Sequence, residues 1–131
     1  LGEWGERVSG PEFGLALGEL RRVAARTLAA LAAYDVVLTP TLAVPPLPVG
    51  ALRDDDDPAA DFEAQKRFTP WTSIWNVTGS PAVSLPLHWT ADGLPVGVML
   101  AAAPGEEATL LSLSAQIESA APWRDRHPAC W

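Results

Sequence analysis

The chain has 131 residues, about half of them apolar, a net charge of −7 and a single lysine. This length suffices for one domain with a hydrophobic core, the apolar content excludes a fully disordered segment, and the negative charge argues against nucleic-acid binding. The single cysteine, Cys130, excludes an internal disulfide and is typical of a reducing, cytoplasmic setting. No apolar run reaches the roughly 18–20 residues needed to span a bilayer, so we expect no membrane insertion. The start at Leu1 fits either a processed domain or a piece of a longer protein.

A long amphipathic helix is predicted over about residues 11–33, after a glycine-containing loop at residues 1–10. Ser9 and Glu12 have the spacing of a capping box, and Pro11 is tolerated in a first turn. Apolar residues then recur in steps of three and four, which places them on one helical face. These residues are Phe13, Leu17, Leu20, Ala24, Leu28 and Leu31.

A short buried strand is predicted directly after this helix, at about residues 35–39, because two valines, a leucine and a threonine precede Pro40. A helix that leads straight into a buried strand indicates the α/β class. Residues 40–60 are rich in proline and glycine and then acidic, which predicts an extended loop. The run Asp54–Asp57 lacks the alternating, glycine-containing spacing of a calcium loop, which favours a solvated loop tip over a cation site.

A β-hairpin is predicted over about residues 82–101, because two apolar runs flank Asp92-Gly93. Pro86 and Pro95 would then have to lie at strand ends, bulges or edges. Before the hairpin we expect a short helix at residues 59–68 and an aromatic, turn-rich stretch.

A last helix is predicted over about residues 106–120. Glu106 and Glu107 suit the positive end of its dipole, and Pro122 ends it.

The chain lacks the sequence patterns of common catalytic sites, including phosphate-binding loops and the Gly-x-Ser-x-Gly elbow. Ser84 and His88 would lie on one strand face about 13 Å apart, at roughly 3.3 Å per residue, which is too far for a nucleophile and its base. His127 and Cys130 could share a helical face, but no two further ligands accompany them. We therefore predict no metal site and no cofactor.

The stretch from Phe68 to Pro86 is the candidate site, because aromatic residues there alternate with turn-forming ones. An asparagine can tie backbone segments together, and Gly79 permits close backbone approach. The tryptophans either line an apolar pocket or fill the core behind the loop, and the sequence favours neither interpretation. The candidate pocket residues are Phe68, Trp71, Ile74, Trp75 and Asn76.

Three motifs occur in the same order as in a known enzyme family. Residues 76–86 read Asn-Val-Thr-Gly-Ser-Pro-Ala-Val-Ser-Leu-Pro, residues 93–98 read Gly-Leu-Pro-Val-Gly-Val, and residues 35–41 read Asp-Val-Val-Leu-Thr-Pro-Thr. Together they resemble the C-terminal part of amidase-signature enzymes. Residues 68–79 and 87–93 are also similar to bacterial 6-aminohexanoate-cyclic-dimer hydrolases. The matching motif positions are Gly79, Pro81, Pro86, Gly93, Pro95 and Gly97.

The resemblance implies an α/β fold in which helices cover a mixed β-sheet, and hydrolysis of a carboxamide C–N bond through an acyl-enzyme. In the family, one serine attacks the carbonyl, a second serine relays a proton and a lysine acts as base. These groups belong to the family's N-terminal half; this chain has no Gly-Gly-Ser-Ser-Gly-Gly segment, and Lys66 is not in a matching context. We therefore expect no catalytic residue in this chain, a missing N-terminal half as its partner, and a small-molecule amide as the substrate of the full-length protein.

Two alternatives remain at this stage. The chain could be a non-catalytic interaction module or part of an amidotransferase-type subunit, with its acidic surface as a docking face, or a small hydrolase that uses Ser84. In isolation, strands cut from a large sheet expose edges and an apolar face, so we expect the chain to form a homodimer, to bind its missing half, or to fold only marginally.

Overall fold

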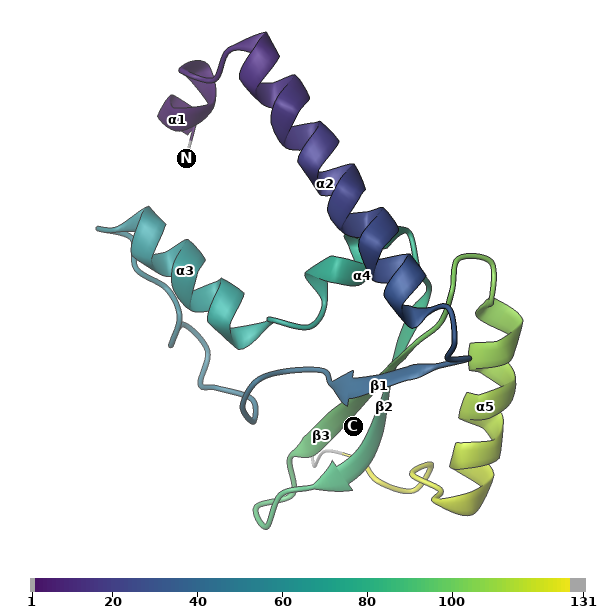
Figure 1. The fold of residues 1–131 in the computed structure, drawn as a ribbon. Helices are drawn as coiled ribbons and strands as arrows, with labels where there is room; N and C mark the ends of the chain where they lie inside the picture. The colour runs from purple at the N-terminus through teal and green to yellow at the C-terminus, as the bar shows by residue number, and fades with distance from the viewer. Residues whose placement is uncertain (1, 128–131) are drawn as a thin grey trace.

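The computed structural model describes residues 2–127 and contains a three-stranded sheet with helices on both faces (Figure 1). The sheet has the order β1-β3-β2, and both pairings are antiparallel. The α/β class is confirmed. The elements in chain order are α1 (Gly2–Glu6), α2 (Gly10–Leu31), β1 (Val37–Pro40), α3 (Pro58–Phe68), α4 (Ser73–Thr78), β2 (Ala82–Trp89), β3 (Pro95–Ala101) and α5 (Glu107–Ala120).

The long helix α2 begins with the predicted capping box. The Ser9 hydroxyl accepts a hydrogen bond from the backbone N–H of Glu12, and the Glu12 carboxylate accepts one from the backbone N–H of Ser9. Upstream, the structure corrects the predicted loop: Gly2–Glu6 form the short helix α1. Its glycines lower helix propensity without forbidding a turn, and Glu3 lies in the first turn, where the helix dipole favours a carboxylate.

Strand β1 differs from the predicted buried strand, because it lies at an edge of the described sheet and the Leu38 side chain is 64% exposed. The backbone N–H of Thr41 donates to the carbonyl of Gly97 at 3.0 Å. Since hydrogen bonding alternates along an antiparallel pair, Leu38 and Pro40 turn their backbone groups toward the open edge. Pro40 therefore extends the strand without breaking a ladder bond.

The β2–β3 hairpin is confirmed, with its turn at Thr90–Leu94. Gly93 has φ +84°, a left-handed conformation that favours glycine. Pro95 is the first residue of β3, and Pro86 lies at a register shift in β2. Both prolines thus occupy the positions that their missing N–H groups require.

The core consists of two clusters, one on each face of the sheet. On one face, Leu85 and Leu100 pack against Leu110 of α5. On the other, Met99 and Ala101 pack against Trp75 of α4, with the C-terminal end of α2 beside them. Neighbouring residues of β3 thus serve opposite faces, as strand pleating requires. Within residues 2–127, no helix is both long and apolar enough to cross a bilayer.

Candidate functional site

The aromatic segment after α3 forms a short helix, α4, where the sequence predicts a turn-rich stretch. Gly79 ends α4 with φ +71°, and its N–H donates to the carbonyl of Trp75. The buried hydroxyl of Thr78 donates to the carbonyl of Ile74 at 2.9 Å. These local bonds explain how a six-residue helix persists, since so short a helix is unstable without capping and tertiary packing.

The five predicted pocket residues differ in burial, and two of them line separate hollows: Phe68 lines a groove beside α3, and Trp75 lines a small pocket beside the end of α2. Trp75 is 7% exposed and lies in the core beside Met99, and Ile74 packs against the same cluster. Trp71 is 42% exposed, and Asn76 is exposed as well. For Trp75 and Ile74 the structure therefore supports core filling, whereas Trp71 and Asn76 remain available to a ligand or a neighbouring segment.

Phe68, the fifth candidate, lines a groove of about 540 Å³ between the loop after β1 and helix α3. The backbone N–H of Ala43 donates to the carbonyl of Phe68 at 3.0 Å, which ties this loop to the end of α3. The lining is mainly apolar, with a few polar side chains. The lining residues are Leu47, Pro48, Gly50, Ala51, Leu52, Arg53, Asp61, Gln65, Phe68 and Thr69.

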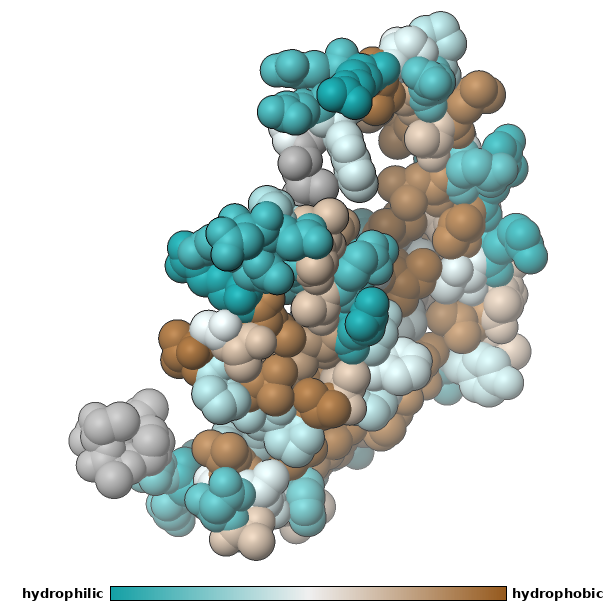
Figure 2. Space-filling view, turned by 90° about the vertical axis from the view of Figure 1, so that its left-hand side faces the viewer, coloured by the Kyte–Doolittle hydropathy of each residue, from teal (hydrophilic) through white to brown (hydrophobic). Residues whose placement is uncertain are grey.

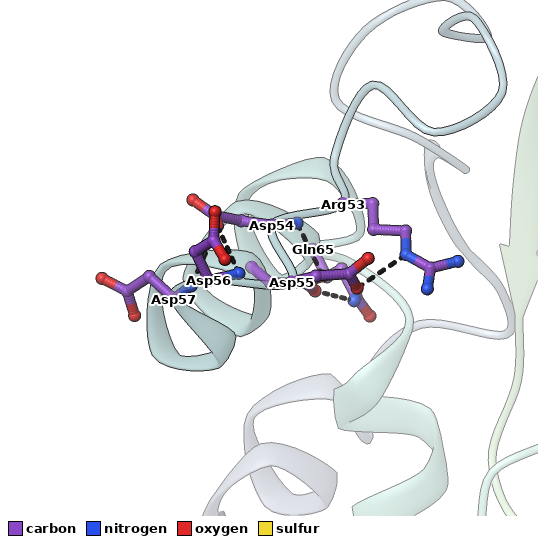
Figure 3. A network of polar contacts seen from close by, with 7 residues as sticks. Arg53, Asp54, Asp55, Asp56, Asp57 and Gln65 are labelled. Atoms are coloured by element: carbon purple, nitrogen blue, oxygen red, sulfur yellow. Dashed lines mark hydrogen bonds and ion pairs between the residues drawn. The ribbon is translucent and has the colours of Figure 1, made fainter.

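The acidic run at the tip of this loop serves as a network of backbone caps (Figure 3). One carboxylate oxygen of Asp54 accepts from the backbone N–H groups of Asp56 and Asp57. Asp57 in turn caps α3 by accepting from two N–H groups in its first turn. Arg53 pairs with Asp55 at 2.7 Å, and both side chains are largely exposed. Among residues 2–127, no group of three or more acidic, histidine or cysteine residues has a metal-binding arrangement; Cys130 lies outside the described residues.

A cluster of small polar side chains that sequence reasoning missed lies on the sheet face that also carries Met99. The hydroxyls of Thr41 and Ser84 share a hydrogen bond of 2.6 Å across β3. Gly97 lies beneath them: a Cβ at this position would lie 2.7 Å from the Ser84 oxygen and 2.8 Å from the Thr41 oxygen. Because Gly97 has no side chain, it leaves room for this hydrogen bond between the two hydroxyls, here called the hydroxyl bridge. The bridge joins Ser84 of β2 to Thr41, the residue that follows β1. The sequence could have indicated this cluster, because the hairpin pairs Pro86 with Gly97 and so brings residues 76–86 and 93–98 side by side.

Ser84 and Lys66 both make contacts that are typical of structural residues. The Ser84 hydroxyl is bonded to Thr41, a residue with no basic group. The Lys66 ammonium pairs with Glu63 at 2.6 Å and lies over the ring of Phe62, with the ion pair more than half exposed. These contacts agree with the interpretation of Lys66 as a surface helix lysine.

Among residues 2–127, three carboxyl groups have a lowered pKa: Glu12 lies in the first turn of α2, Asp92 in the hairpin turn, and Glu63 in the middle of α3. Hydrogen bonds with Ser9 lower the pKa of Glu12. A hydrogen bond and the charge of Lys66 lower the pKa of Glu63, and a hydrogen bond with a turn threonine lowers the pKa of Asp92. Each shift favours the ionised form, which suits a structural cap more than a general acid at neutral pH.

Comparison with known protein families shows which family this chain belongs to. A family model described as "Amidase" matches residues 14–111. The chain belongs to the amidase family. The match covers most of α2, the whole sheet and the beginning of α5, and so includes all the buried residues of the two core clusters.

The curated relatives of this amidase-family chain are considerably longer. "Putative amidase AmiC" of Mycobacterium tuberculosis strain H37Rv is 42% identical over 113 residues, which cover 86% of this chain and 24% of the relative. The protein of the same name from Mycobacterium leprae is 44% identical over 111 residues, 82% of this chain and 23% of the relative. The chain thus spans about a quarter of the length of these relatives.

Solved structures also match this chain over about a quarter of their own length. A 6-aminohexanoate cyclic dimer hydrolase matches with a TM-score of 0.86 and 32% identity, over 95% of this chain and 27% of that one. A glutamyl-tRNA(Gln) amidotransferase subunit from Thermotoga maritima matches with a TM-score of 0.70 over 87% of this chain and 24% of the other, and its 24% identity shows a shared fold only.

Proposed function

We propose that this chain is the C-terminal portion of an amidase that hydrolyses a carboxamide C–N bond through a serine acyl-enzyme, with its catalytic residues outside these 131 residues. One observation carries the proposal: nearly the whole chain superposes on about a quarter of a 6-aminohexanoate cyclic dimer hydrolase. The hydroxyl of Ser84 and the ammonium of Lys66 are engaged in structural contacts, which supports placing the catalytic groups elsewhere.

The proposed reaction requires groups that an N-terminal half would supply. A serine hydroxyl attacks the amide carbonyl while a lysine, acting through a second serine, takes up the proton. Backbone N–H groups stabilise the negative charge that develops on the carbonyl oxygen. The second serine returns that proton to the amide nitrogen, the C–N bond breaks and the amine leaves; water then hydrolyses the acyl-enzyme and restores the serine hydroxyl. This chain would hold the sheet rigid beside that site and contribute one wall of the substrate pocket.

We assign the pocket wall to Phe68, Trp71 and Asn76, with Ile74 and Trp75 supporting it from the core. The assignment rests on exposure: Trp71 and Asn76 face outward, and Phe68 lines the groove beside α3. An apolar wall with one amide side chain suits an uncharged acyl chain with a polar carboxamide. By similarity to the cyclic dimer hydrolase, we propose linear or cyclic amides as substrates. We also propose a cytoplasmic location, because the chain has a single cysteine.

The test compares two proteins with the same panel of simple linear and cyclic amides. The full-length protein that carries this sequence is expected to release amine, and the 131-residue chain alone is expected to release none. Hydrolysis by the isolated chain, or a reading frame without a serine- and lysine-bearing half, would contradict the proposal. Inactive full-length protein that co-purifies with partner subunits would favour an amidotransferase-type role instead.

A further inference from the structure

Helix α2 carries an apolar stripe that the described residues leave largely uncovered. Its 22 residues make a helix about 33 Å long, which rises away from the sheet in Figure 1. At its C-terminal end, Leu31 packs against the Trp75 cluster. Toward its N-terminus, Phe13 is 63% exposed and Leu20 is 47% exposed. Within residues 2–127, the stripe therefore packs against the core at its C-terminal end, while its N-terminal part stays exposed.

The exposed N-terminal part of the apolar stripe lies on the same face of α2 as the packed C-terminal part. At 100° per residue, Phe13 and Leu31 lie at nearly the same angle around α2, and Leu20 lies within about 20° of both. Figure 2 shows hydrophobic residues in a column that runs below the hydrophilic top of the molecule and to the right of the central hydrophilic patch. The apolar surface thus continues from the core cluster outward along α2.

The arrangement of α2 recurs inside a much longer chain. The superposition on the cyclic dimer hydrolase covers 95% of this chain, and α2 accounts for far more of the chain than the unmatched remainder. In that protein the matching region is 27% of the polypeptide. A helix that keeps this position in a chain about three and a half times as long has further polypeptide available to cover its stripe.

We propose that the stripe of α2 around Phe13, Leu17 and Leu20, which we call the α2 stripe, packs against the catalytic portion of the full-length amidase. The inference rests on the proposed function, because it takes that portion as the partner. The partner surface would be apolar, since removing exposed aromatic and aliphatic side chains from water is what favours such an association. The α2 stripe would then join the catalytic portion to the sheet through the Trp75 cluster.

The test uses the full-length protein with Phe13→Asp and Leu20→Asp as separate variants. The matched control is Leu15→Asp, because Leu15 is 71% exposed and lies about 200° from Phe13 around the helix. Burying an unpaired carboxylate in an apolar interface is strongly unfavourable, so the stripe variants are expected to shorten the half-life of the folded protein at elevated temperature at least tenfold. The control is expected to change it less than twofold.

Hydrogen exchange separates the possible occupants of the stripe. In the full-length protein, amides of residues 13–20 are expected to exchange at least tenfold faster in the Phe13→Asp variant than in the Leu15→Asp variant. Equal effects of all three substitutions, or equal exchange in both variants, would overturn the proposal. It would also be overturned if the full-length protein formed a dimer that protects residues 13–20 and that Phe13→Asp dissociates, because a second copy would then be the occupant. These readouts need no substrate, so a failed hydrolysis assay does not decide them.

Discussion

Replacing Gly97 with alanine tests the packing of the sheet most sharply. The new Cβ would lie 2.7 Å from the Ser84 oxygen, 2.8 Å from the Thr41 oxygen and 3.1 Å from the Thr41 Cβ. Overpacking of this kind costs about 1–3 kcal/mol, and separating the two hydroxyls removes a hydrogen bond worth about 1 kcal/mol. We therefore expect Gly97→Ala to lower the free energy of unfolding by about 2–4 kcal/mol.

The assay is urea unfolding of the 131-residue chain, followed by tryptophan fluorescence in a buffer with an osmolyte that secures the folded baseline. With a slope of about 2 kcal/mol per molar urea, the unfolding midpoint is expected to fall by about 1–2 M. Gly18→Ala is the matched control, because nothing lies within 4 Å of its added Cβ and alanine favours a helix by about 0.5–1 kcal/mol.

A double-mutant cycle identifies the cause of the Gly97→Ala effect. Ser84→Ala removes the closest clashing atom, so Gly97→Ala is expected to cost at least about 0.5 kcal/mol less in that background. An unchanged midpoint for Gly97→Ala, or the same cost in both backgrounds, would refute the proposed role of the hydroxyl bridge.

Four further outcomes are expected. Trp75→Ala should cost about 3–5 kcal/mol in urea unfolding because it empties a core position, whereas Trp71→Ala should leave stability within about 0.5 kcal/mol and raise KM of the full-length protein. Lys66→Ala should leave kcat unchanged in amide hydrolysis, since the ammonium only pairs with its own helix. Ser84→Ala should likewise leave the amide-hydrolysing activity of the full-length protein in place. The pKa of Glu12 is lower in the folded protein than in the unfolded chain. The ionised carboxylate therefore stabilises the fold above the unfolded pKa, and this contribution is lost as pH falls through the folded pKa. Glu12→Gln should reduce this loss of stability at acid pH in a series of unfolding curves.

Features encoded by neighbouring residues could be predicted from the sequence. The Ser9–Glu12 capping box needs only residues three positions apart, and it forms as expected. The turn at Asp92-Gly93 follows from the conformational freedom of glycine, and Pro86 lies where its missing N–H does no harm. In each case the local chemistry and the final fold favour the same conformation.

Features that depend on distant segments could not be predicted in the same way. The edge position of β1 depends on which strand pairs with it, although its apolar composition is typical of an interior strand. Helix α4 is held by packing on Met99, a residue of the later hairpin. The burial of Trp75 and the exposure of Trp71 likewise follow from tertiary packing, so the sequence could not divide the candidate pocket residues between core and surface.

Trapping the acyl-enzyme tests the central claim most directly. The full-length protein is incubated with an activated ester or amide and quenched in acid, and the acylated peptide is identified by mass spectrometry. The account predicts acylation of a serine outside these 131 residues, and no acylation of the isolated chain under the same conditions. Acylation of Ser84, or of any other residue in this chain at the rate of turnover, would contradict it.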